Sequence, residues 1–215
     1  MLKAIKLSFT VILLLLSASG LLNAQDVIRA SGGTDLSIDL ISSGQYVTLT
    51  GPTIRETSVG QLAQNGTIIL TLPNGYEWNT ALTGSDITLT IEPTGAANTQ
   101  LAASFTGFNN NQEVVFTIDS ESVTRGNGQG PGRIQISGLQ LRPATTTVPD
   151  NGTISNTGTT APNVNYGDLS KVAGSTAEVS IETAPDGTGQ VVPTQDILAG
   201  NTLTVYAIGR DIGGN

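Results

Sequence analysis

Residues 87–91 read Ile-Thr-Leu-Thr-Ile, and this short stretch decides the fold class. Ile87, Leu89 and Ile91 alternate in it with two threonines. Successive side chains of an extended strand point to opposite faces, so the three apolar residues share one face and the threonines share the other. The stretch therefore predicts a β-strand with one face in a hydrophobic core and the other in water.

The same alternation recurs along the chain on both sides of this stretch. Its apolar positions are Leu36, Ile38 and Leu40; Val47 and Leu49; Ile68, Leu70 and Leu72; Leu101, Ala103 and Phe105; Val114, Phe116 and Ile118; Val179 and Ile181; and Leu203, Val205 and Ala207. Turn residues bound these runs at 65–66, 73–75, 83–85, 109–111 and at Asn151-Gly152. No stretch keeps a 3.6-residue period over a full helix length, so we predict an all-β chain.

The register of the apolar positions shifts at one glycine. Ile134 and Ile136 are even-numbered, whereas Leu139 and Leu141 are odd-numbered, and Gly138 lies between them. The extra residue predicts either a β-bulge at Gly138 or a strand that passes from one sheet to another. Because many short strands with frequent turns are most simply buried in two layers, we expect an Ig-like or related two-sheet antiparallel β-sandwich.

The strength of this alternation divides the chain into two parts. Residues 142–171 have the weakest alternation and are rich in Thr, Pro, Asn and Gly. We predict a β-sandwich domain over residues 26–169, with residues 142–171 partly an edge strand and partly an exit linker. Residues 172–215 hold only a few predicted strands, too few to close a sandwich. They are either the start of a second, truncated Ig-like domain or strands that complete the first.

Residues 1–24 have the three-part pattern of an export signal. Lys3 and Lys6 precede an apolar run at 11–16, and small residues follow it. The uninterrupted run is short of the ~20 residues that cross a bilayer, which favours a cleaved signal peptide over a membrane anchor. We expect cleavage between Gly20 and Ala24 and a secreted or cell-surface protein.

The composition excludes several classes of site. The 215 residues include neither histidine nor cysteine, so the chain has no Ser-His-Asp triad, cysteine nucleophile, imidazole or thiolate zinc site, or disulfide. With 17 acidic and 9 basic side chains, the net charge of −8 makes nucleic acid and anionic membranes poor partners. We expect no catalytic residue, cofactor or metal.

Two segments resemble parts of bacterial surface proteins. Residues 200–215 resemble the opening of bacterial Ig-like repeats, in which a strand after a glycine carries alternating apolar residues and ends in an aspartate before a Gly-Asn turn. Residues 66–78, Gly-Thr-Ile-Ile-Leu-Thr-Leu-Pro-Asn-Gly-Tyr-Glu-Trp, are similar to a segment of large secreted multidomain surface proteins of Gram-negative bacteria. The resemblance implies display, spacing or adhesion rather than catalysis.

Tyr76 and Trp78 are the residues that could bind a sugar by stacking. They are two positions apart, so in a strand both rings lie on one face. An exposed face would give a carbohydrate platform, whereas a single tryptophan near a turn is more typical of a core position. The core position is the interpretation that we favour.

The remaining polar motifs are each better explained by turns and loops. Asp119, Glu121 and Asp186 could offer oxygen ligands to calcium, but their spacing matches no EF-hand loop. The glycine-rich residues 126–132 lack the Lys-Ser/Thr pair of a P-loop, and Arg133 begins a predicted strand, so we expect a hairpin loop there.

Two further patterns give weaker hypotheses. Glu56, Glu77 and Glu113 could meet as paired carboxylates for glycoside hydrolysis, although no local motif selects any two of them. Asn65-Gly66-Thr67 and Asn151-Gly152-Thr153 match the glycosylation sequon, but Asn-Gly is also the strongest turn dipeptide.

The sequence thus favours a non-catalytic, exported β-sandwich module with a structural or adhesive role. Its expected partners are neighbouring domains of a larger surface protein, or an extracellular glycan or protein. The alternative is a carbohydrate-binding module of a polysaccharide-acting protein. Buried rings at Tyr76 and Trp78 would favour the first function, and an exposed aromatic strip would favour the second.

Overall fold

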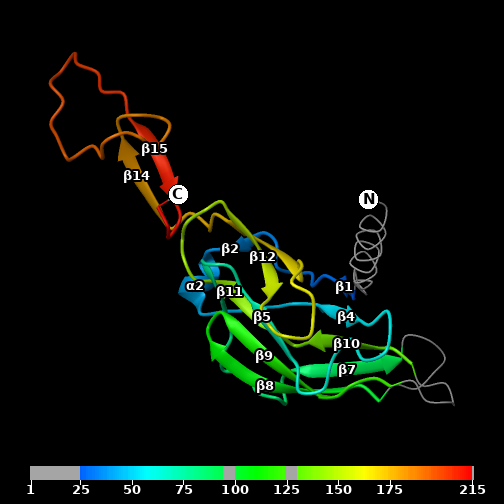
Figure 1. The fold of residues 1–215 in the computed structure, drawn as a ribbon. Coiled ribbons are helices and arrows are strands. Elements are labelled where there is room, and N and C mark those ends of the chain that lie inside the picture. The colour runs from blue at the N-terminus through cyan, green and yellow to red at the C-terminus, as the bar shows by residue number, and fades with distance from the viewer. Residues whose placement is uncertain (1–24, 94–99, 124–129, 215) are drawn as a thin grey trace, which may run out of the picture.

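The computed structural model describes residues 25–93, 100–123 and 130–214, so the predicted signal peptide lies outside the described residues. The chain is nearly all β, with 44% strand and 3% helix, and Figure 1 shows its arrangement. The strands are β1 (Asp26–Ile28), β2 (Leu36–Ser37), β3 (Val47–Thr48), β4 (Thr53–Arg55), β5 (Thr67–Thr71), β6 (Tyr76–Trp78), β7 (Thr88–Pro93), β8 (Ala102–Asn110), β9 (Glu113–Ser120), β10 (Gly132–Ser137), β11 (Gln140–Pro143), β12 (Asp150–Asn156), β13 (Gly167–Val172), β14 (Glu178–Glu182) and β15 (Tyr206–Arg210), and α2 (Asp39–Ser43) is a short helix.

Two sheets pack around one hydrophobic core. One has the strand order β1-β4-β10-β7, and the other has the order β2-β13-β12-β5-β9-β8, in which β2 and β13 run parallel. Ile54 and Ile134 from the first sheet share the core with Ile68 and Phe116 from the second, and each is at most 1% exposed. A three-stranded sheet, β3-β11-β6, adds Leu141 to the same core. The predicted all-β sandwich is confirmed.

The stretch at residues 87–91 behaves as its alternation predicts. Thr88 and Thr90 on β7 are exposed, whereas Ile87 is buried and both Leu89 and Ile91 pack against the core. The threonines therefore lie on the solvent face of the four-stranded sheet, as the alternation requires.

Gly138 lies where the chain passes from one sheet to another. It joins β10, in the four-stranded sheet, to β11, in the three-stranded sheet. Its φ is 89°, and a Cβ at this position would lie 2.1 Å from the carbonyl oxygen of Asp86. Ile136 before it and Leu139 after it are both fully buried. Of the two predicted alternatives, the crossing between sheets is therefore correct.

The predicted strand through Leu36, Ile38 and Leu40 is interrupted. Pairing with β13 ends at Ser37, whose hydroxyl accepts a hydrogen bond from the Asp39 amide at 3.2 Å. The chain then forms α2, so Leu40 lies on a helix instead of a strand and is only half-buried. Local side-chain bonding to the backbone competes here with the strand ladder.

The predicted exit linker in residues 142–171 is wrong. β12 and β13 occupy much of this region and are interior strands of the six-stranded sheet, paired over five residues. Asn151-Gly152 is within β12 instead of a turn, and Pro73 packs so close to Gly152 that a Cβ there would lie 2.5 Å from the proline Cγ. β13 also continues to Val172, beyond the predicted domain end at residue 169.

β14 and β15 form a separate two-stranded antiparallel sheet. Figure 1 shows this C-terminal hairpin projecting from one end of the sandwich, with the loop between its strands extending farther out. In the described part of the chain, no helix has the length and apolar character needed to cross a membrane.

Candidate functional site

The two aromatic residues considered as a sugar platform are buried. Tyr76 and Trp78 lie on β6 and are each 1% exposed. The Tyr76 hydroxyl donates to the carbonyl of Asp150 at 2.6 Å, and Trp78 Nε1 donates to that of Gln112 at 3.1 Å. Burial, followed by the negative charge of Asp150, raises the pKa of Tyr76 to about 12. The favoured core interpretation is confirmed, and these rings offer no platform to a ligand.

Two of the three acidic residues considered as calcium ligands have separate local partners. Asp119 on β9 accepts a hydrogen bond from Ser104 at 3.0 Å, and Asp186 in the loop after β14 accepts two from Thr188 at 2.7 and 3.1 Å. Glu121 follows β9 and is exposed. Within residues 25–93, 100–123 and 130–214, no three acidic side chains lie close enough to hold a metal ion.

The three glutamates considered as catalytic carboxylates are also held by different partners. Glu56 is 1% exposed and accepts two backbone N–H groups at 2.9 and 2.8 Å. Glu77 pairs with Arg142 at 2.7 Å, and Glu113 accepts from Asn109 at 3.0 Å. The carboxylate of Glu56 thus stabilises the loops around it, and these contacts do not bring the three residues together as an acid and base.

An open hollow of about 270 Å³ lies beside Glu56. Its other lining residues are Asp26, Arg55 and Thr57. Asp26 on β1 lies directly opposite Arg55 on β4, so one cross-strand pair of opposite charges lines the hollow. Such cross-strand pairs stabilise a sheet surface, and this arrangement supplies no activated nucleophile.

The glycine-rich segment and the two sequons have different outcomes. Residues 126–129 lie outside the described residues. β10 begins at Gly132 and includes Arg133, which agrees with the predicted strand. The expected hairpin is wrong, because β9 and β10 belong to different sheets and do not pair. Asn65 has a φ of 62° in the turn before β5, which confirms the turn interpretation there. Asn151 lies within β12, so the turn interpretation is wrong for the second sequon.

A buried lysine that no sequence motif predicted lies on β13. The side chain of Lys171 on β13 is fully buried, and Nζ lies 2.9 Å from Asp150 Oδ2 and 2.7 Å from Thr145 Oγ1. It also donates to the carbonyl oxygens of Thr145 at 3.2 Å and Gly75 at 3.4 Å. Its position two residues after Leu169 puts it on the core face of an alternating strand, and this was the signal that could have revealed it.

The C-terminal hairpin, by contrast, exposes its apolar residues. Val179 and Ile181 on β14 are 63% and 43% exposed, and Leu203 and Val205 before β15 are 43% and 39% exposed. The register places Val179 and Ile181 on the same face of the hairpin as Ala207, which is also exposed. We refer to Val179, Ile181 and Ala207 as the apolar face. The strand predicted through Leu203, Val205 and Ala207 begins only at Tyr206, so the register does not place Leu203 or Val205 on this face.

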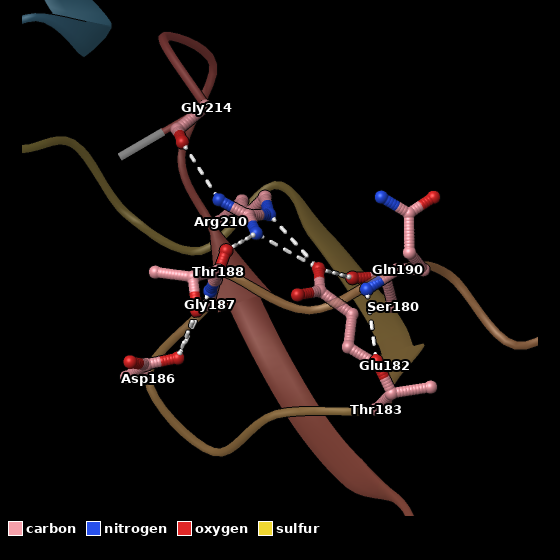
Figure 2. A network of polar contacts seen from close by, with 9 residues as sticks. All are labelled: Ser180, Glu182, Thr183, Asp186, Gly187, Thr188, Gln190, Arg210 and Gly214. Carbon is pink, nitrogen blue, oxygen red and sulfur yellow. Dashed lines mark hydrogen bonds and ion pairs between the residues drawn. The ribbon is translucent and has the colours of Figure 1, made fainter.

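The opposite face of the hairpin carries a polar network centred on Arg210 (Figure 2). Its guanidinium donates to Glu182 Oε1 at 2.8 and 3.3 Å and to the carbonyl oxygens of Gly187 at 2.7 Å and Gly214 at 3.1 Å. The Ser180 hydroxyl donates to the same Glu182 oxygen at 2.7 Å. Through these hydrogen bonds, the loop after β14 and the residues after β15 cover the polar face of the hairpin. The apolar face stays exposed to solvent.

The hairpin is tied to the sandwich by two carboxylates. Asp211, directly after β15, accepts a hydrogen bond from the Gly174 amide at 2.9 Å, and Asp39 on α2 accepts one from the Ser175 amide at 2.8 Å. A Cβ at Gly174 would lie 2.1 Å from Asp39 Oδ1. The segment that connects β13 to β14 is therefore hydrogen-bonded to the sandwich through Asp39 and to the hairpin through Asp211.

Comparison with known proteins adds no further assignment. No family model matches the chain, and no curated protein or solved structure is significantly similar to it.

Proposed function

We propose that this chain is a non-catalytic, exported β-sandwich module with a structural or adhesive role, and that the apolar face of its C-terminal hairpin is the contact surface. The observation that carries the proposal is the contrast in burial. Tyr76 and Trp78 are buried in the sandwich core, whereas Val179 and Ile181 are left in water. An exposed apolar surface is typical of a site that binds another macromolecule.

The sandwich contributes a rigid support for this surface. Most of its candidate acidic residues make local hydrogen bonds, as Glu56 does with two backbone amides. Asp39 and Asp211 limit the freedom of the connection between the sandwich and the hairpin. These contacts suit a module that presents a surface, and they give no support to a hydrolytic mechanism.

The export part of the proposal rests on Lys3, Lys6 and the apolar run that follows them. Expression of the full chain in a Gram-negative host would test it by mass spectrometry of the exported protein. A chain that begins between residues 21 and 25 supports export with cleavage, and exported material that still begins at Met1 contradicts it.

The adhesive role is tested by displaying residues 25–215 on a non-adherent yeast. Adhesion is measured on polystyrene, on a surface coated with the purified protein and on immobilised polysaccharides. Ile181→Lys adds a charge to the apolar face and should abolish adhesion to the first two surfaces. Thr90→Lys adds the same charge to the exposed face of β7 and serves as the matched control, with adhesion unchanged.

The other outcomes distinguish the remaining functions. Saturable polysaccharide binding that survives Ile181→Lys would favour the carbohydrate-binding alternative, through a surface other than the buried rings. Release of new reducing ends from the polysaccharides would show an enzyme and would overturn the proposal.

A further inference from the structure

β15 pairs with β14 along one edge only, and its other edge can accept a further strand. The amide of Val192 donates to the Ile181 carbonyl at 2.8 Å, so the backbone groups of Ile181 point away from β15. Ile181 is directly opposite Ala207. In an antiparallel pair of strands, two opposite residues direct their N–H and C=O groups either both toward the other strand or both away from it. These two kinds of pair alternate along the strands. Ala207 and Gly209 therefore direct their N–H and C=O groups away from β14, and both residues are exposed.

The other sheet edges have features that prevent pairing with another chain. β8, at the edge of the six-stranded sheet, has three register irregularities, and β7 ends at Pro93. The edge strands β1, β2, β3 and β6 have only three, two, two and three residues, and the outer edge of β14 is partly covered by Val192. Bulges, prolines, short strands and covering segments are the usual protection of an edge. β15 has five residues and, within the described chain, none of these features.

The sequence of β15 is suited to antiparallel pairing with itself. A two-fold axis through Ile208 places Ala207 opposite Gly209 of the second copy, and Gly209 opposite Ala207. Because the backbone groups of both residues point outward, each of these two pairs exchanges two hydrogen bonds. The same register places Arg210 opposite Tyr206 of the second copy, a cation beside an aromatic ring that is 36% exposed.

We propose that two copies of this chain associate through β15 and form a continuous four-stranded sheet from their two hairpins. A two-stranded sheet is marginal in water, and four strands are enough for independent stability. The inference rests on the proposed function, since it names the partner of the same hairpin. It also joins the apolar faces of both copies into one wider surface.

Proline substitutions test the pairing while keeping the hairpin intact. Ala207→Pro removes an outward N–H from β15, a position at which an edge strand tolerates proline. Leu198→Pro places a proline in the exposed loop before β15, outside the apolar face, and is the control. By analytical ultracentrifugation between about 1 and 500 µM, we expect a reversible dimer of residues 25–215 that Ala207→Pro weakens at least about tenfold and Leu198→Pro changes less than about twofold.

Cysteine crosslinking tests the register, because the natural chain has no cysteine. The two Ile208 residues would form a non-hydrogen-bonded pair with Cα atoms about 4.5 Å apart, within the range of a disulfide. Ile208→Cys should therefore give a disulfide-linked dimer under mild oxidation. Tyr206→Cys should not, because its two copies would lie roughly 14 Å apart along the strands.

Three results would overturn the inference: a monomer at the highest concentration, a dimer that persists in Ala207→Pro, or equal crosslinking of the two cysteine variants. In each case the proposed function is judged separately, by the effect of Ile181→Lys on adhesion to polystyrene. Loss of adhesion in Ile181→Lys would then retain the apolar face as a contact surface even though the self-pairing is rejected.

Discussion

Lys171 and Asp150 are directly opposite each other on β13 and β12, and Lys171 Nζ lies 2.9 Å from Asp150 Oδ2. The lysine side chain is fully buried, whereas that of the aspartate is 34% exposed. The ammonium group is also bonded to Thr145 and lies 5.2 Å from the centre of the Tyr76 ring. This one side chain joins β13 to the loop before β12 and to the turn before β6.

Replacement of this lysine should destabilise the sandwich. Lys171→Met keeps most of the side-chain volume but removes the ammonium group that pairs with Asp150 and donates to Thr145, so we expect a loss of about 2 kcal/mol or more in the free energy of unfolding. Urea denaturation measures this loss when it is monitored by the fluorescence of Trp78, the single tryptophan. Arg29→Ala is the control: its ion pair with Asp168 is more than half exposed on both sides and should contribute less than about 1 kcal/mol. Equal effects of the two substitutions would contradict this role for Lys171.

Gly138 should tolerate no side chain. Gly138→Ala places a Cβ 2.1 Å from the carbonyl oxygen of Asp86 in a backbone with a φ of 89°. We expect a loss of about 3 kcal/mol or more, from strain and from displacement of buried neighbours. Gly84→Ala is the control, because its Cβ would meet only Phe105, at 3.8 Å. Thermal unfolding gives the stability of both variants. A Gly138→Ala protein as stable as Gly84→Ala would show that the backbone between β10 and β11 can shift to accept a side chain.

The fold was predictable from the sequence wherever one face of a strand is buried. Ile68 and Leu70 are buried as their alternation requires, and the change of sheet at Gly138 is one of the two alternatives that the shift of apolar register predicted. Alternation carries this information because a slip by one residue would expose every apolar side chain.

The missed elements depend on contacts between distant residues. Asn151-Gly152 has the composition of a turn, yet it lies in β12, where Pro73 packs against Gly152 and leaves no room for a side chain. Lys171 is polar at a core position because its partners come from segments far away in the sequence. At the candidate site, the apolar face was predictable from alternation, but the network of Arg210 depends on a loop conformation that no local pattern specifies.

The hairpin network should weaken in acid. The hydrogen bond from Ser180, and then the contacts with Arg210, hold the pKa of Glu182 below its ordinary value. A carboxyl with a lowered pKa in the folded state contributes stability above its unfolded pKa, and this contribution is lost as pH falls through the folded value. We therefore expect the amide signals of β14 and β15 to shift and broaden below about pH 4. NMR spectra recorded across this range test it, and Glu182→Gln should remove the pH dependence.

Limited proteolysis should separate the two parts of the chain. The sequence alone predicts first cleavage in residues 143–171 or 184–195. Because β12 and β13 are interior strands, we now expect cleavage in the exposed loop of the hairpin, at residues 184–205, before any cleavage of residues 143–171. Mass spectrometry of the early fragments identifies the site. A hairpin loop as resistant as the sandwich would contradict the separate character of the C-terminal unit.

The central claim is that the C-terminal hairpin is the contact surface of the molecule. Amide hydrogen exchange of residues 25–215 at about 2 and 500 µM tests it most directly, because association protects the groups that pair. We predict that protection at the higher concentration appears at Ala207 and Gly209 and leaves the exposed face of β7 unchanged. Protection that appears on the faces of the sandwich while β15 exchanges equally fast at both concentrations would contradict the account.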